Sequence, residues 1–334
     1  MKGKSLLIMT ALVAFAVIFA AGCIDGGNGG PTEEKTELSF GYQPSTHQIA
    51  YMVAKDKGWW EEDLAPFGIT TITDHKFPTG APEMQAMLAG EIDVAYVGAA
   101  PVISALDQGL DAKIIAAVQV QGSDLVVRPE VTYTGPEDLK GLTIATFPPG
   151  TIQDTLLRDW LQQNGIDPDT DVDIRGMGPG DATVAIAESA VDAVFLPHPA
   201  PATIAAEGNG YTAVTSGEMM QDHACCVLVA SGDLIRNHPD IVEQIVKTHI
   251  RATEYSIENQ EEAAQIYHDM NKVELDVIEA SFASWDGRWV TDPALIVVSV
   301  VDYTEVQAEL GYIKNPMTAD EIFDLSFYEK AVAA

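Results

Sequence analysis

The chain has 334 residues, and its 50 Asp and Glu residues outnumber its 18 Lys and Arg residues, which gives a formal net charge of −32. This charge argues against binding to nucleic acid or to anionic lipid surfaces, because both are themselves negatively charged. The length is sufficient for two compact lobes, and acidity spread over a solvated surface is typical of proteins suited to high salt.

The first 37 residues are predicted to export and anchor the chain. Two lysines precede an apolar, uncharged stretch over residues 6–21, which is shorter than a membrane span and typical of a secretory signal. Cys23 directly follows Ala-Gly, as in lipoprotein signals, although Ala20 occupies the position of the usual leucine. We expect cleavage after residue 22, lipidation of Cys23 and a flexible tether over residues 23–37. The alternative is ordinary cleavage near Ala21, with Cys23 as an incidental thiol.

After the tether, strand patterns alternate with helix patterns. We expect strands over 38–43, 70–77, 92–97 and 112–120, and helices over 47–57, 81–89 and from Pro101 onward. Gly58 and Gly90 follow expected helix ends, where glycine is favoured. Such alternation predicts a mostly parallel sheet with helices on both faces, so that the turns after the strands meet at one edge.

The stretch from Pro78 to Pro101 is the most informative. An expected strand ends in Gly98-Ala99-Ala100, and Pro101 suits the first turn of the helix that follows. A strand that ends in small residues and passes directly into a helix leaves backbone N–H groups free. This turn therefore favours a small ligand, preferably one with negative charge.

The second half of the chain repeats this design. We expect strands over 142–147, 172–175, 190–195 and 224–229, a helix over 153–163 capped by Thr151, and another capped by Asp181. The glycine run before Asp181 lacks the G-x-G-x-x-G spacing, and no G-x-x-x-x-G-K occurs, so neither a dinucleotide site nor an ATPase site is expected. Helices are then expected over 240–257, 261–270, 275–284 and 293–309.

Three segments carry a resemblance to a known family: MLAGEIDVAYVGAAPVISALDQG, LKGLTIATFPPGTIQDTLLRDWLQQNGID and GYIKNPMTADEIFDLSFYEKA. They resemble the substrate-binding proteins of ABC importers in the sulfonate, nitrate and taurine group, which is NMT1/THI5-like. The resemblance covers residues 38–330. It implies a type II periplasmic-binding-protein fold, with a ligand cleft between two α/β lobes. It also implies a monomer at the extracytoplasmic face of the membrane, which passes its ligand to a permease and ATPase and catalyses no reaction.

The lobes are expected to be discontinuous in sequence. Residues 38–122 and 228–334 are assigned to the first lobe and residues 123–227 to the second, because crossing segments are expected near Gln121 and Cys226.

Candidate ligand-binding residues come from the turns that should face the cleft. The resemblance implies that Thr151 and Gln153 touch the ligand. Leu196 replaces a carboxylate that family members often have, which makes an amino-bearing ligand such as taurine less expected. The full set of candidates is Gln43, His47, Gly80, Ala99, Ala100, Gln121, Thr151, Gln153, Asp181, His198 and Cys225.

The expected ligand is a small oxyanion, sulfonate-like first, held by helix N-termini and neutral donors because these turns contain no Lys or Arg. Two alternatives remain. One is a thiamine pyrimidine precursor stacked on Trp285 or Tyr42. The other is an enzyme related to the thiamine-pyrimidine synthases, for which no spacing ties His47, His198, His223 and Cys225 together.

Cys225 and Cys226 are expected to be free thiols that point to opposite faces of a strand. A metal site formed by His223, both cysteines and His198 is considered and not expected, because consecutive residues cannot easily point at one ion. No cofactor is expected.

Overall fold

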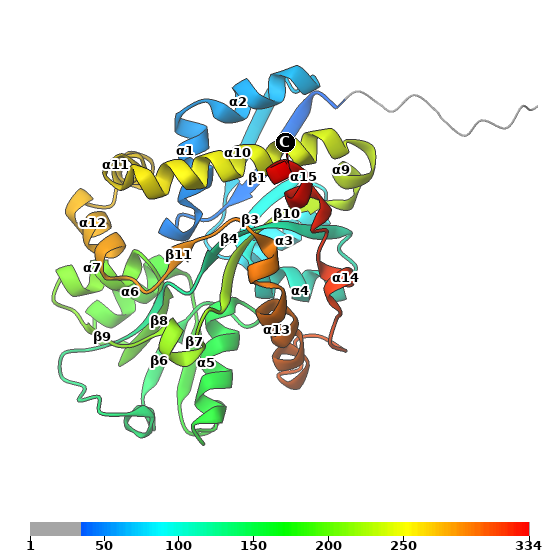
Figure 1. Cartoon of the computed structure of the whole chain (residues 1–334). Helices are drawn as coiled ribbons and strands as arrows, with labels where there is room; N and C mark the ends of the chain where they lie inside the picture. The colour runs from blue at the N-terminus through cyan, green and yellow to red at the C-terminus, as the bar shows by residue number, and fades with distance from the viewer. Residues whose placement is uncertain (1–34, 334) are drawn as a thin grey trace, which may run out of the picture. The chain divides into compact units, whose positions relative to one another are not determined.

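The computed structural model describes residues 35–333 (Figure 1). The expected signal, Cys23 and nearly all of the expected tether lie outside these residues. Within the described range, no helix has both the length and the apolar character that a membrane crossing requires.

The fold is a two-domain α/β fold built on two sheets. The first sheet has the order β11-β4-β10-β3-β1-β2 and the second has the order β7-β6-β8-β5-β9. The first contains β1 (Glu37–Tyr42), β2 (Thr71–Lys76), β3 (Val94–Gly98), β4 (Ala112–Val120), β10 (Ala224–Ser231) and β11 (Arg288–Trp289). The second contains β5 (Ser123–Val127), β6 (Thr143–Thr146), β7 (Asp173–Gly176), β8 (Ala193–Pro197) and β9 (Tyr211–Thr215).

The two-lobe α/β fold predicted from the sequence is confirmed, but the sheets are mixed rather than mostly parallel. β1 is parallel to β2 and β3, and β6 is parallel to β7 and β8. In each sheet one crossing strand is inserted in the opposite direction: β10 lies between β3 and β4, and β5 lies between β8 and β9. β10 starts at the edge where β3 and β4 end, and β5 starts where β8 and β9 end. Each of the two inserted strands therefore runs antiparallel to both of its neighbours.

Helices cover both faces of these sheets. The principal ones are α1 (Ile49–Asp56), α3 (Gly80–Leu88), α4 (Ala99–Asp107), α5 (Ile152–Gln163), α6 (Pro179–Ala187), α10 (Pro239–Glu258), α11 (Gln260–Asn271), α12 (Leu275–Ser284) and α13 (Val297–Glu309). The shorter ones are α2 (Trp59–Leu64), α7 (Ala200–Ala206), α8 (Ser216–Met219), α9 (Gly232–Asn237), α14 (Ala319–Ile322) and α15 (Ser326–Ala333).

C-terminal helices pack against the first half of the chain. α10 lies beside α1, while α13 contacts both α4 and α5 (Figure 1). The first-sheet core includes the aromatic rings of Phe40, Tyr51, Trp60 and Tyr96, and separate apolar clusters flank the second sheet. The lobe boundaries at 122/123 and 227/228 stay a prediction.

Two local details differ from the sequence expectations. Asp181 does not cap a helix: α6 begins at Pro179 after Gly178, and Asp181 lies exposed in its first turn. Pro179 fixes the start because proline is favoured in the first helical turn. Trp59 and Trp60 open the unpredicted α2 after Gly58, which has a φ of +69°, and Trp60 is buried in the core.

Candidate binding site

Residues from both sheets line one small pocket, with a cavity volume of about 20 Å³, at the ends of the parallel strands. The lining comes from the turn after β1, the ends of β3, β6 and β8, the start of α5 and the start of β10. Its members are Gln43, Ser45, His47, Gln48, Gly98, Phe147, Ile152, Gln153, Pro197, Cys225 and Cys226. The convergence arises because the strands of each parallel set end at one edge of their sheet.

An adjoining pocket of about 30 Å³ shares Gln43, Ser45, Phe147 and Pro197 with the first. It adds Pro44, Pro78, Pro179, His198, Pro199 and Ala200. A larger pocket of about 180 Å³ is lined by α3, α4, Pro149, Gly150 and Tyr312 and contains none of the predicted site residues. The first two pockets together form the candidate site.

Two helices, one from each half of the fold, begin at the first pocket. α4 begins directly after Gly98, and α5 begins after Thr151, whose hydroxyl accepts a hydrogen bond from the backbone N–H of Asp154 at 3.4 Å. Helix N-termini carry partial positive charge and unpaired N–H groups. The pocket therefore favours a ligand with negative charge, although none of the described residues that line it is Lys or Arg.

Amide side chains supply the neutral polar groups. The Nε2 of Gln153 donates to the hydroxyl of Ser123 at 3.1 Å, and the Nε2 of Gln43 donates to Oε2 of Glu83 at 2.8 Å. Glu83 is fully buried, and this burial raises the pKa of its carboxyl well above the usual range. The environment of Glu83 thus favours the neutral acid, which avoids a fixed negative charge behind the pocket.

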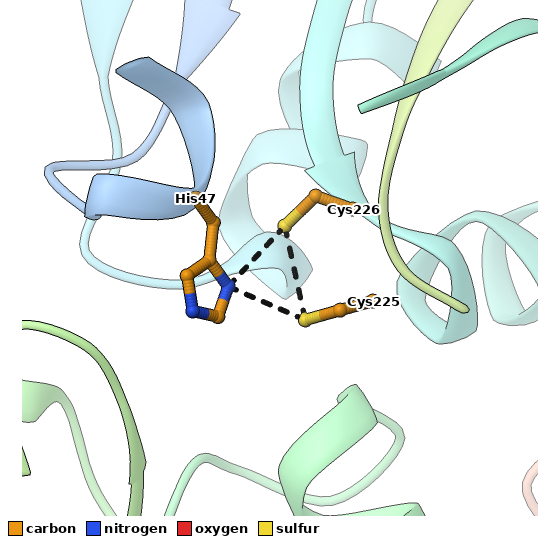
Figure 2. Close-up of side chains that lie close together, drawn as sticks. All are labelled: His47, Cys225 and Cys226. Atoms are coloured by element: carbon orange, nitrogen blue, oxygen red, sulfur yellow. Dashed lines mark hydrogen bonds between the residues drawn. The ribbon is translucent and has the colours of Figure 1, made fainter. Parts of the chain in front are cut away.

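His47 and the two cysteines form a compact cluster in the pocket wall (Figure 2). The Nε2–H of His47 donates to the carbonyl oxygen of Gly122 at 2.7 Å. Its Nδ1 then faces Sγ of Cys225 at 3.4 Å and Sγ of Cys226 at 3.9 Å, and the two sulfur atoms are 3.9 Å apart. The sequence spacing gave no reason to join His47 to Cys225, and the fold brings them together.

The prediction that the two cysteines point to opposite faces is wrong. β10 pairs with β4 through Ala224 opposite Val120 and Cys226 opposite Gln119, so Cys225 is an extra residue on its strand. Such a β-bulge breaks the alternation of side chains and re-aims one of them. Both thiols therefore reach the same space (Figure 2).

The two thiols differ in acidity. The hydrogen bond between the two thiols lowers the pKa of the Cys226 thiol, with a further lowering by His47, against the opposing effect of burial. That same interaction, together with burial, raises the pKa of the Cys225 thiol well above its usual range. The cluster therefore favours a single thiolate, on Cys226.

His198 belongs to the adjoining pocket, and a protein group lies near each nitrogen of its ring. Its Nδ1 is 2.9 Å from the hydroxyl of Ser281, and its Nε2 is 3.3 Å from Oδ2 of Asp124. The ring is buried, and the hydrogen bond to Ser281 orients it at the pocket edge, while Nε2 makes no hydrogen bond to the described residues.

Six predicted residues lie outside the lining of these two pockets. Gln121 donates through Nε2 to the carbonyl oxygen and the carboxylate of Asp286, and accepts from the N–H of Asp222, which secures the crossing after β4. Thr151 serves as the cap of α5. Gly80, Ala99 and Ala100 are buried where helices begin, and Asp181 is exposed.

Sequence reasoning missed several members of the lining. Ser45 and Gln48 flank the predicted His47, and Gln48 accepts a hydrogen bond from the backbone N–H of Gln43 at 2.6 Å. A polar residue at a strand-to-helix turn was the available signal. Trp285 and Tyr42, the expected stacking residues, do not line either pocket; the aromatic ring that does belongs to Phe147.

Comparison of the sequence with known proteins shows a match to one family. The model of the NMT1-like family matches residues 31–268. The protein of Bacillus subtilis (strain 168) that is named "Putative aliphatic sulfonates-binding protein" is 26% identical, with 96% of each chain covered. The nitrate/nitrite binding protein NrtA of Nostoc sp. is 24% identical over 85% of this chain and 74% of its own length.

Solved structures have the same fold. The periplasmic nitrate-binding protein NrtA of Synechocystis PCC 6803 superposes with a TM-score of 0.79 at 19% identity, covering 90% of this chain and 89% of that one. The alkanesulfonate-binding protein SsuA of Xanthomonas axonopodis pv. citri, bound to MOPS, gives a TM-score of 0.77 at 19% identity and covers 87% and 99%. Since the family model spans well over half of the sequence, the chain belongs to the NMT1-like family.

Proposed function

We propose that the protein is an extracytoplasmic, lipid-anchored solute-binding component of an ABC importer. It captures a small oxyanion between its lobes and delivers the anion to a permease driven by an ATPase. A sulfonate is the first candidate and nitrate the second. The names of two relatives, one given for aliphatic sulfonates and one for nitrate and nitrite, support this class of ligand.

The observation that carries the proposal is the meeting of helix N-termini and amide donors at one pocket. The starts of α4 and α5 supply N–H groups, while Gln43 and Gln153 supply side-chain donors. Each charge-assisted hydrogen bond in a closed, dry site contributes about 1.5–3 kcal/mol, so several together hold an anion without a lysine or arginine. None of the described residues that line the pocket is Asp or Glu, so no carboxylate of the lining repels the ligand.

Calorimetric titration of the purified mature protein with alkanesulfonates, nitrate, taurine and pyrimidines tests the proposal. We expect an alkanesulfonate to bind and Gln153→Leu to weaken that binding roughly 10- to 100-fold, the equivalent of one charge-assisted bond. Gln162→Leu is the matched control, because it makes the same change on an exposed part of the same helix and should leave the affinity unchanged.

A pyrimidine ligand is the second candidate, and Phe147, which lines both pockets, is the residue that favours it. Tight binding of a pyrimidine, with no heat from any sulfonate or nitrate, would falsify the anion assignment while leaving the transport role intact. Chemical change of any ligand during incubation would instead favour an enzyme.

A further inference from the structure

We propose that the Nδ1 of His47 and the thiolates of Cys225 and Cys226 form a binding site for a zinc-like divalent cation, with its open side on the pocket. The proposal concerns the three protein ligands alone and does not depend on which solute the importer carries. It rests on their spacing, the fixed tautomer of the histidine, the bulge in β10 and the burial of the cluster.

The spacing of the three ligand atoms fits one tetrahedral ion. With about 2.3 Å from zinc to sulfur and about 2.0 Å to nitrogen, a tetrahedral centre separates two sulfurs by about 3.8 Å and sulfur from nitrogen by about 3.5 Å. The two sulfur atoms are 3.9 Å apart, and they lie 3.4 and 3.9 Å from Nδ1 of His47. Three edges of the tetrahedron are therefore already in place.

The histidine is oriented as a metal ligand requires. Its Nε2–H donates to the carbonyl oxygen of Gly122 at 2.7 Å, which leaves the lone pair of Nδ1 directed at the thiols. A backbone carbonyl on the far ring nitrogen is a common second partner of metal-binding histidines, because it fixes both tautomer and ring orientation.

The bulge overcomes the usual objection to consecutive ligands. In a regular strand neighbouring side chains point to opposite faces, so Cys225 and Cys226 would not reach one ion. The extra residue in β10 brings both sulfur atoms to the side of His47.

The chemistry of the three ligands selects the class of ion. Thiolate and imidazole ligands favour zinc and related soft cations over magnesium or calcium, which prefer oxygen. Two thiolates balance the charge of a divalent ion, and all three residues are buried, so their charges would be costly to leave unpaired. Because the three line the pocket, the fourth position faces the space available to water or an anion.

Binding involves no change of oxidation state. The metal–sulfur bonds form as the proton that remains on the cluster leaves to the buffer, so zinc uptake must be accompanied by proton release. A hydrogen-bonded cysteine–histidine pair for covalent catalysis needs only one thiol, whereas the metal site accounts for both.

The test is a zinc titration of the reduced mature protein, without any anion, by calorimetry in buffers of different ionisation enthalpy. We expect one zinc ion per chain and accompanying proton release. Cobalt(II) used as a probe should give the visible bands of a tetrahedral ion and a near-ultraviolet sulfur-to-cobalt charge-transfer band. Cys225→Ser, Cys226→Ser and His47→Ala should each weaken binding on the order of 100-fold or more, since even indirect partners of a metal commonly contribute 10- to 100-fold.

His75→Ala is the matched control, because His75 is an exposed histidine outside the cluster and its loss should leave the zinc affinity unchanged. Circular dichroism melting identifies any variant that fails to fold, and X-ray absorption of the wild-type complex then counts sulfur ligands directly. The proposal is overturned if the wild type binds no zinc, if the cysteine variants bind it equally, or if absorption shows no sulfur ligand. Each of these results leaves the separate anion titration unaffected.

Discussion

The side chain of His47 donates a hydrogen bond of 2.7 Å to the carbonyl oxygen of Gly122. This bond joins the turn after β1 to the crossing between β4 and β5, so it links the pocket wall to the segment that connects the two sheets. The crossing residue Gly122 has a φ of +83°, a conformation that side-chain-bearing residues rarely adopt. Any movement of the crossing therefore moves the ring that faces the two thiols.

The first prediction concerns this glycine. Gly122→Ala places a Cβ atom 2.5 Å from Nε2 of Gln119, 2.8 Å from the ring of Trp285 and 2.9 Å from Nε2 of His47. We expect a loss of unfolding free energy larger than the cost of the backbone conformation alone, which is about 1–2 kcal/mol. Gly90→Ala is the control, because Gly90 has a φ of +73° and open space around it. Equal losses for the two variants in urea denaturation would show that the contacts at Gly122 do not matter.

The second prediction concerns Glu83, whose burial raises the pKa of its carboxyl well above 4.5. The folded protein keeps this proton to a higher pH than the unfolded chain, so wild-type stability falls as the pH rises above 4.5. Glu83→Gln cannot ionise and still offers an oxygen to Gln43. We expect this variant to be more stable than the wild type at pH 8, with the difference shrinking toward pH 4.5.

Urea denaturation across this pH range measures the effect of Glu83. Glu188→Gln, at an exposed position after α6, provides the comparison and should follow the wild-type curve. A Glu83→Gln variant that is no more stable than the wild type at pH 8 would contradict a buried neutral carboxyl.

The third prediction concerns acid sensitivity. Burial lowers the pKa of His249 from 6.5 to about 4. Its Nε2–H donates to the carbonyl oxygen of Ala117 at 2.8 Å and its Nδ1 is 3.1 Å from the hydroxyl of Tyr96, so the neutral ring has a partner for both nitrogens. Below pH 6.5 His249 takes up a proton in the unfolded chain but stays neutral in the folded protein. The free energy of unfolding therefore decreases as the pH falls from 6.5 to about 4.

The slope of unfolding free energy against pH reports how many more protons the unfolded chain binds than the folded protein. Replacing His249 with glutamine should lower this slope between pH 6.5 and 5 by the equivalent of about one proton. His223 behaves in the same way, because burial lowers its pKa to about 4. The remaining slope should therefore fall again in the double variant with His223→Gln. An unchanged slope in both variants would place the acid sensitivity elsewhere.

The fourth prediction concerns the anchor, which lies outside the described residues. If Cys23 carries the lipid, Cys23→Ser should release the protein from membranes, because a tether over residues 23–37 has no other strong membrane affinity. Sulfonate affinity should stay unchanged, since the pocket lies within residues 43–226. Membrane fractionation measures the release, and equal retention of the variant would contradict lipidation.

Much of the fold could be predicted from local sequence patterns. Hydrophobic periodicity predicts strands such as β1. Signals at helix ends predict that α1 ends before Gly58 and that Thr151 caps α5. These are properties of neighbouring residues, so the sequence carries them directly. The position of Gln43, His47 and Gln153 at turns after strands was predictable for the same reason.

Only the tertiary structure decided which strands are antiparallel and where the thiols point. β10 and β5 enter their sheets beside strands that are distant in sequence, and no local pattern encodes that pairing. The bulge at Cys225 depends on the register with Val120 and Gln119, about a hundred residues earlier, and that register overrides the alternation that a single strand predicts. The sequence by itself determined that small turns and polar donors would meet at one edge. The pairing of β10 with β4 decided that two neighbouring cysteines would face one histidine there.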